Sequence, residues 1–457
     1  MTQIFVAGTM YGAMTVAAAI DAGLFGGGRR VLLTANNAAI PQLATPLHEM
    51  PGFEALAGRF HEVLSWNDLI DPLHPFGWTP RAEDLPVFER LLRDRWGLGT
   101  DPVELVTESI AVSPGRALAM IFHDAPVTVY SDGLMAYGPT RTSLPNVGPR
   151  IDRLLHLDLV PGLKPRLLEE YGVPPAIVPD EAFLAVLAEV TTEVAPVLAR
   201  HGSGLEGAAL IVGQYLAALD LISESAEEDL HLRMLRGCAA RGHTTVLFKP
   251  HPTSQTSLSG RLAEEAGKLG VRLVVIDDPV PAEVWWATAK PELVVGCFST
   301  AQMTALRFFG ATAACSGTRM MLDQLTPYQN SNRVPLVITD TLLPHLDAEG
   351  KLSTPVIDLD RAGEELAPLL TAVTYCMQAG SRPELRNDAQ AFLAEHAEGP
   401  MLRYFKRRRL TSLKLPGGLS QSNRRLLTAA LPPHTKRREL ALKALRKTEE
   451  MRGQTDE

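Results

Sequence analysis

The sequence predicts an α/β protein with two successive parallel-sheet domains. Short apolar runs rich in β-branched residues alternate with helix-length segments from residue 1 to about 133, and again from about 208 to 314. Such runs are typical of strands that are buried on both faces of a parallel sheet. With 457 residues, the chain is long enough for two domains of about 200 residues, each with its own core.

The first domain opens with a strand, a helix and a second strand. Ile4–Ala7 is the first strand, an Ala-rich helix follows over Ala13–Ala22, and Arg30–Thr34 is the second strand. This βαβ order predicts a parallel sheet. The alternation continues with a helix over Leu85–Trp96, a strand over Val103–Val106, a helix over Pro114–Phe122 and a strand over Val127–Tyr130.

Many prolines interrupt the pattern between Pro139 and Pro179, and we interpret this stretch as interdomain, followed by a connecting helix over Glu181–Ala199. We expect an N-terminal domain over 1–140, a linker with its helix over 141–205, a C-terminal domain over 206–380 and a helical basic tail over 381–457. The second domain has predicted strands over Ala208–Val212, Thr244–Phe248, Val271–Ile276, Leu293–Val295 and Ala311–Ala314. The helices between them are predicted over Ala226–Arg241, Ser259–Leu269, Pro281–Ala289 and Ala301–Phe309.

Composition indicates an ordinary globular protein, with 46% apolar and 21% charged residues. No apolar run reaches the roughly 18 residues that a membrane span needs. The start, Met1-Thr2-Gln3, leads directly into a strand without a charged leader, so we expect a cytoplasmic protein. The four cysteines form no C-x-x-C pair, which argues against a zinc site or a disulfide framework.

The net charge of -8 is unevenly distributed. Met401–Glu457 contains 15 Lys+Arg against 5 Asp+Glu, a balance of +10, which leaves -18 for the first 400 residues. A basic tail is either a solvated helix or a segment attracted to anionic phospholipid, and the acidic body argues against nucleic acid. The basic run Lys406–Arg409 has apolar neighbours of the kind found in interfacial helices, namely Leu402, Tyr404, Phe405 and Leu410.

Two short segments of the second domain carry the strongest functional signal. Lys249-Pro250-His251-Pro252 and Phe298-Ser299-Thr300 each follow a predicted strand. An open α/β sheet binds its ligand at the carboxyl ends of its strands, so both segments should face one crevice. The two prolines preset the backbone around His251, and Lys249 adds positive charge. Ser299-Thr300 can cap the helix that follows and can also bind an anion, and the two roles are compatible.

Asp132-Gly133 ends a strand of the first domain. An Asp before Gly is common in plain turns, but this one lies at the edge where a carboxylate could face His251. We therefore interpret Asp132 as functional.

Other motifs are weaker. Gly8 and Gly12 open a helix after a strand, as phosphate loops do, but close packing of the helix on the sheet explains them equally well. The G-x-G-x-x-G spacing at 202–207 precedes a strand, so it does not match the dinucleotide fingerprint. Asp358-Leu359-Asp360 has the letters of a metal-binding Asp-x-Asp motif, although a helix cap explains it better, and we expect no metal.

Three motifs in this order resemble those of the bacterial sialyltransferases of GT-B fold, and of the α-2,8-polysialyltransferase family in particular. They are Tyr130-Ser131-Asp132-Gly133, Lys249-Pro250-His251-Pro252 and Phe298-Ser299-Thr300. The resemblance covers about residues 1–320. One position departs from it, because the family commonly has a second acidic residue directly before Asp-Gly, where this chain has Ser131.

The resemblance implies two Rossmann-like domains facing a cleft, and inverting, metal-independent transfer of a sialic acid or a related nonulosonic acid. The donor would be a CMP-sugar, the acceptor a glycan or lipid-linked hydroxyl, and no cofactor would be needed. Asp132 would be the base, with Gly133 and Gly8 on the acceptor side. The residues expected at the donor phosphate are His251, Lys249, Ser299 and Thr300. Gln214 and Glu283 are weaker candidates for the ribose or base.

Two alternatives remain open on the residues alone. Another GT-B transferase of cell-wall assembly, such as one that uses CDP-glycerol, would share the His251-Pro252 segment at the donor phosphate and could use Asp132 as its base. A non-enzymatic nucleotide-binding or scaffold protein, in which the basic tail is the functional segment, is the other alternative.

Overall fold

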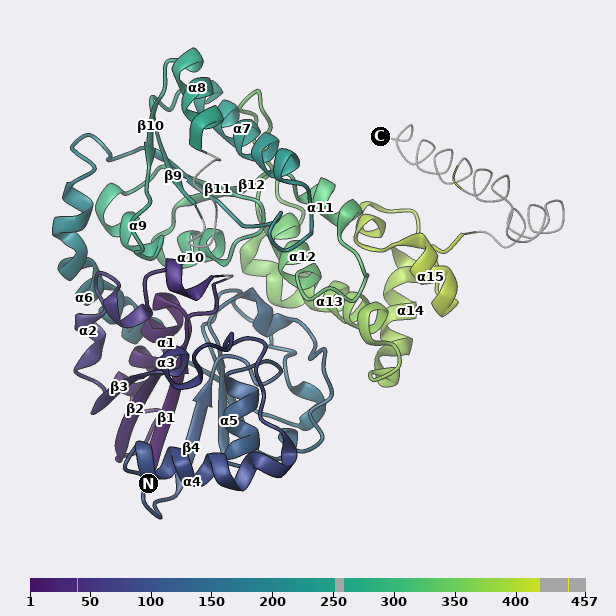
Figure 1. Ribbon diagram of the computed structural model, residues 1–457. Coiled ribbons are helices and arrows are strands. Elements are labelled where there is room, and N and C mark those ends of the chain that lie inside the picture. The colour runs from purple at the N-terminus through teal and green to yellow at the C-terminus, as the bar shows by residue number, and fades with distance from the viewer. Residues whose placement is uncertain (39, 251–258, 420–442, 444–457) are drawn as a thin grey trace. The chain divides into compact units, whose positions relative to one another are not determined.

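The computed structural model describes residues 1–38, 40–250, 259–419 and 443 (Figure 1). The chain divides into two compact units, Met1–Leu370 and Thr371–Glu457. The first unit contains both predicted sheets, so the α/β class and the two successive parallel sheets are confirmed.

The first sheet has seven strands in the order β3-β2-β1-β4-β5-β6-β7, and the pairings between them are parallel. The strands are β1 (Thr2–Ala7), β2 (Arg29–Thr34), β3 (Glu62–Ser65), β4 (Val103–Thr107), β5 (Val127–Ser131), β6 (Ile151–His156) and β7 (Pro175–Ile177). Every residue of β1 and β5 is buried, which agrees with the apolar runs that predicted these strands.

The second sheet has five parallel strands in the order β10-β9-β8-β11-β12. The strands are β8 (Ala209–Val212), β9 (Thr245–Lys249), β10 (Arg272–Val275), β11 (Leu293–Gly296) and β12 (Thr312–Cys315). Each of the five matches a predicted strand to within a few residues. In both sheets the chain first builds outward in one direction and then returns to build in the other, which is the doubly wound arrangement.

Helices connect the strands of both sheets. Those of the first domain and its connection are α1 (Met10–Asp21), α2 (Glu54–Ala57), α3 (Trp66–Ile70), α4 (Leu85–Arg95), α5 (Gly115–Ile121) and α6 (Asp180–Ala199). Those of the second sheet are α7 (Glu224–Ala240), α8 (Ser259–Leu269), α9 (Glu283–Ala289) and α10 (Thr300–Phe309). The later helices are α11 (Thr318–Gln324), α12 (Arg333–Leu342), α13 (Ala362–Gln378), α14 (Arg386–Glu395) and α15 (Arg407–Leu413).

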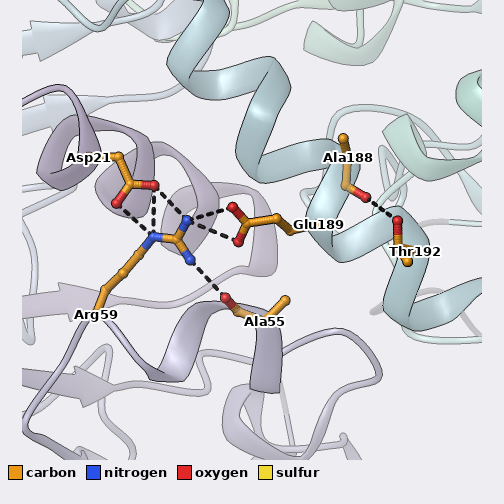
Figure 2. A network of polar contacts seen from close by, with 6 residues as sticks. All are labelled: Asp21, Ala55, Arg59, Ala188, Glu189 and Thr192. Atoms are coloured by element: carbon orange, nitrogen blue, oxygen red, sulfur yellow. Dashed lines mark hydrogen bonds and ion pairs between the residues drawn. The ribbon is translucent and has the colours of Figure 1, made fainter.

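The connecting helix α6 lies against α1 and α2 of the first domain and against α9 of the second (Figure 1). Arg59 holds its N-terminal half in place, as Figure 2 shows. The guanidinium donates from Nε to Asp21 on α1 at 2.9 Å and from Nη2 to Glu189 on α6 at 3.0 Å. Its Nη1 donates to the Ala55 carbonyl at 2.7 Å. The planar Arg59 guanidinium thus joins three helices through several hydrogen bonds.

The expectation that no segment is apolar enough to cross a membrane needs a correction at α6. Within the described residues, this helix alone has the length and composition for a span, with a mean hydropathy of 1.7 over its most apolar window. It packs on both domains, and its buried side chains are Phe183, Val186, Leu187, Val190, Val194 and Leu198. Packing between the domains therefore accounts for its apolar face.

The stretch interpreted as interdomain contains two further strands. β6 and β7 extend the first sheet past residue 140 to Ile177, so the first domain is longer than predicted. Prolines at positions 149, 174 and 175 border these strands, and because proline is typical of loops, the sequence analysis did not predict the strands. β3 was also missed, because its four residues are only half-buried and form no apolar run.

The second unit contains the described part of the predicted basic tail. Arg409 donates from Nε to the Cys376 carbonyl at 2.7 Å within this unit. The apolar side chains expected to anchor the tail in a membrane are largely used in packing, since Tyr404, Phe405 and Leu410 are buried. Membrane association therefore stays a prediction that rests on charge, and residues 420–442 and 444–457 lie outside the described part.

Candidate active site

The predicted site residues that the structure describes lie at the carboxyl edges of both sheets. Two contacts of the first unit bring these edges together. The Leu134 amide, just after β5, donates to Thr300 Oγ1 at the start of α10, at 3.3 Å. The Tyr11 hydroxyl on α1 lies 3.2 Å from Thr304 Oγ1 on α10. The crossing point of the two domains is therefore where parallel α/β sheets bind ligands.

Each sheet also has a topological switch point at this edge. In the first sheet it lies between β1 and β4, and in the second between β8 and β11. Gln214 follows β8, and its Oε1 accepts the Phe298 amide after β11 at 2.8 Å, which joins the two loops of the second switch point. Gln214 therefore positions the donor-side loop, and a contact with ribose or base stays a prediction.

Asp132 follows β5 and lies over the first turn of α1. A Cβ on Gly12 would be 3.3 Å from Asp132 Oδ2 and 3.1 Å from the Tyr130 hydroxyl, so Gly12 allows this close approach. Burial raises the pKa of Asp132. A carboxylate with a raised pKa is a better proton acceptor, which suits a general base.

The glycines of the first domain have packing roles. A Cβ on Gly8 would be 3.2 Å from the Ala35 carbonyl, so close packing explains this glycine better than a phosphate loop does. A Cβ on Gly133 would be 2.8 Å from Thr300 Oγ1, so Gly133 is needed where the two domains touch. Both remain beside the site without a demonstrated contact to a substrate.

Glu108 is a site residue that the sequence analysis missed. It follows β4 directly, and burial followed by the charge of Asp132 raises its pKa. Its side chain is nevertheless exposed to solvent. Water therefore reaches the Glu108 carboxyl group, which weakens the effect of burial on its pKa. The signal was available, because Glu108 ends a buried strand as Asp132 does, but no motif marks it.

Glu283 begins α9 and is 4% exposed. Burial raises its pKa to about 7, the charge of Asp132 adds to the rise, and Lys249 opposes it. Burial and the charge of Glu283 also raise the pKa of Tyr11. Glu283 thus faces the first domain rather than only the nucleotide end of the second, and Tyr11 is a further residue that the sequence analysis missed.

Lys249 ends β9 and is 6% exposed. Its Nζ donates to the Asp278 carbonyl at 3.0 Å. Burial lowers the pKa of Lys249 to about 8, and nearby carboxylates, Asp278 first, partly oppose this. The loop that carries Asp278 is fixed from the residues just after α6, since the Asp278 carboxylate bonds His201 and Arg200. Lys249 is therefore a held cation with donors left for an anion.

Ser299 and Thr300 open α10. Ser299 Oγ accepts the Ala301 amide, and Gln302 Oε1 accepts the Ser299 amide at 2.8 Å, which forms a capping box. Thr300 Oγ1 accepts the Leu134 amide. Each hydroxyl keeps its own proton for donation, so capping and phosphate binding are compatible.

His251, the expected partner of the donor phosphate, lies outside the described residues, as do 252–258. Asp358 and Asp360 lie at a short 3-10 turn over Leu359–Arg361 that leads into α13, away from the strand edges. Asp358 occupies the predicted N-cap position, but its side chain makes no capping hydrogen bond.

Glu283 should reduce stability at neutral and alkaline pH. Its carboxyl group ionises near pH 4.5 in the unfolded chain and at about 7 in the fold, so stability falls as pH rises through this window. At 1.36 kcal/mol per pKa unit, the full cost is about 3 kcal/mol above pH 7. Glu283→Gln should therefore raise the melting temperature at pH 8 but not at pH 4. An equal shift at both pH values would contradict this, and Glu193→Gln on an exposed face of α6 is the control.

Two doubly wound domains whose strand ends meet, with the Asp132 carboxyl group on one side and the Lys249 ammonium on the other, have the architecture of glycosyltransferases of the GT-B fold. A sequence match over residues 3–318 then identifies the family, that of the α-2,8-polysialyltransferases. The chain belongs to this family and is a glycosyltransferase of the sialyltransferase type. The proposed resemblance is thereby confirmed, and the alternative of a non-enzymatic nucleotide-binding protein is not supported.

The chain is similar to several solved structures at low sequence identity and with TM-scores below 0.5. The GT-B domain of a Photobacterium damselae sialyltransferase is 11% identical, with a TM-score of 0.41, over 74% of this chain and 96% of that one. A 2,6-sialyltransferase of Photobacterium sp. JT-ISH-224, in complex with CMP and lactose, is 12% identical, with a TM-score of 0.44, over 74% and 75%. MurG of Acinetobacter baumannii is 10% identical, with a TM-score of 0.39, over 84% and 98%. A search of curated proteins found no significant match. The family assignment rests on the sequence match alone.

Proposed function

We propose that the chain transfers a sialic acid or a related nonulosonic acid from its CMP-activated form to a sugar hydroxyl, with inversion and without a metal ion. The observation that carries the proposal is the opposition of Asp132 on the first sheet to Glu283 and Lys249 on the second. An inverting transfer needs a base for the attacking hydroxyl and, on the other side of the reacting carbon, groups that stabilise the leaving phosphate.

On the donor side, negative charge develops on the phosphate of CMP as its bond to the anomeric carbon breaks. Lys249, the hydroxyls of Ser299 and Thr300 and the N-terminus of α10 are placed to stabilise this charge. From its sequence position two residues after Lys249, His251 should act at the same phosphate. A nucleoside monophosphate carries less charge than a diphosphate, so these groups can take the place of a metal. Glu283 and Gln214 are candidates for the ribose or base.

On the acceptor side, Asp132 removes the proton of the attacking hydroxyl. The hydroxyl oxygen bonds to the anomeric carbon, the carbon–phosphate oxygen bond breaks, and its electron pair leaves with CMP. The proton ends on Asp132. Attack from the face opposite to the leaving group inverts the anomeric carbon.

The acceptor is proposed to be a growing or lipid-linked surface glycan, in keeping with the family. We propose a cytoplasmic location, with the +10 balance of Met401–Glu457 drawing the enzyme to the anionic inner face of the membrane.

The test is CMP release from a panel of CMP-sugars in the presence of EDTA, with CDP-glycerol as the rival donor. CMP-nonulosonate should be cleaved, and cleavage should persist in EDTA because protein groups stabilise the phosphate. Turnover of CDP-glycerol alone would favour the teichoic-acid type of reaction. Full loss with EDTA that Mg²⁺ or Mn²⁺ restores would contradict the metal-free mechanism.

A further inference from the structure

Glu108 and Asp132 lie at the ends of neighbouring strands. The register of β4 and β5 pairs Thr107 with Val129, so its continuation places Glu108 level with Tyr130, two residues before Asp132. Paired residues of parallel strands point to the same face, and alternate residues return to that face. Glu108, Tyr130 and Asp132 therefore share one face of the sheet edge.

Tyr130 lies beside both carboxyl groups but neutralises neither. β4 lies between β1 and β5, and the Tyr130 hydroxyl donates to the Val6 carbonyl on β1 at 2.8 Å, so the side chain passes the end of β4. The single hydroxyl proton is used in that bond. Burial raises the pKa of Tyr130, and the charges of Glu108 and then Asp132 add to this rise.

The groups around the two carboxyl groups are themselves acidic or neutral. Tyr215, after β8 of the second domain, also has a pKa raised by burial and then by the charge of Glu108. Tyr11 and Glu283 lie on the other side, toward Asp132. The positive charge of Lys249 acts on Glu283. Burial and like charge both disfavour the simultaneous ionisation of two neighbouring carboxyl groups.

We propose that Glu108 and Asp132 form one acid–base pair on the acceptor side, in which Glu108 carries the proton and Asp132 is the free carboxylate. The inference rests on the proposed function and extends it. It also accounts for Ser131, because the second carboxyl group comes from the neighbouring strand instead of the residue before Asp132.

The pair has a defined proton balance. Protonated Glu108 donates a hydrogen bond to Asp132 or to the acceptor oxygen. Because Glu108 is neutral, the pair carries a single negative charge. During transfer, the acceptor's proton moves to Asp132, the Glu108 proton stays, and the pair then loses one proton to solvent. Of the two groups, Glu108 ionises later, because the charge of Asp132 adds to the effect of burial on its pKa.

The pair predicts two limbs in the pH profile of kcat/KM for the acceptor at saturating donor. Activity falls at low pH as Asp132 becomes protonated, and at high pH as Glu108 loses its proton. Glu108→Gln cannot ionise but keeps a hydrogen-bond donor, as protonated Glu108 does, so it should retain most of kcat/KM at neutral pH and remove the alkaline limb. The acid limb should remain.

Glu104→Gln is the matched control, because Glu104 lies on the same strand, bonds Gln3 and lies four residues from Glu108. It should keep both limbs. Lys249 also loses its proton, and with it its charge, at alkaline pH. It acts on the donor, so its effect should appear in the inhibition constant of CMP for both variants alike. An alkaline limb that survives in folded Glu108→Gln would overturn the proposal.

A second readout does not need turnover. Carbon-13 NMR of the side-chain carboxyl groups should show Glu108 titrating at lower pH in Asp132→Asn than in the wild type, because a like charge has been removed. An unchanged midpoint would overturn the pair. If the wild-type enzyme cleaved no CMP-sugar but the Glu108 midpoint still moved in Asp132→Asn, the proposed function would be refuted and the pair would remain supported.

Discussion

Asp132→Asn is expected to lower transfer by roughly 10²- to 10⁴-fold, the range for a removed general base, while CMP binding stays nearly intact. Asn fills the same space over Gly12 but cannot accept the acceptor's proton. The charge of Asp132 faces Glu283 on the donor side, so its removal should leave CMP affinity unchanged or slightly raise it.

Isothermal titration of CMP and steady-state transfer, measured on the same preparation, test this expectation. Asp124→Asn is a suitable control, because this exposed residue precedes β5 in the same domain and lies at the opposite end of the strand. If Asp132→Asn lost CMP affinity as well as transfer, Asp132 would belong to the donor site or to the fold. Near-normal transfer would remove it from the mechanism.

The sequence predicts most of the sheets, because a strand buried on both faces must be apolar. Val127–Ser131 and Leu293–Gly296 are examples in which almost every residue is apolar or β-branched, and both were found. β3 and β7 are edge strands with half-buried or exposed residues, so no comparable pattern marks them. Burial, rather than strand formation itself, is what the sequence pattern reports.

The sequence also predicts which residues stand at strand ends but not which strands are neighbours. Asp132 and Lys249 were found because a conspicuous residue follows a clear strand. Glu108 follows a strand equally clearly, but its pairing with Asp132 depends on β4 lying beside β5, and its electrostatic effect on Tyr215 depends on the second domain. Such relations come from the topology of the whole chain. The direction of Glu283 toward the first domain was missed for the same reason.

A large effect on CMP binding is also expected from substitutions of Ser299 and Thr300 at the start of α10. Ser299→Ala combined with Thr300→Ala should weaken CMP binding by roughly 10- to 100-fold, because each hydroxyl can give one hydrogen bond to a charged phosphate. These contacts exist in the ground state and in the transition state alike, so the loss should appear in the CMP dissociation constant and not only in turnover.

Both substitutions also remove structural bonds, and the controls must separate these effects. Ser223→Ala removes the N-cap of α7 in the same domain, where Ser223 Oγ accepts the Ala226 amide at 3.2 Å, so it costs a comparable cap of about 1 kcal/mol without touching the site. Thr300→Ser keeps the hydroxyl that accepts the Leu134 amide and should retain most of the CMP affinity. The division between the domains requires the double variant to lose CMP while Asp132→Asn keeps it. If the double variant bound CMP as tightly as Ser223→Ala does, the start of α10 would be a helix cap and an interdomain contact only, and the donor phosphate would have to be held by Lys249 and the His251 segment.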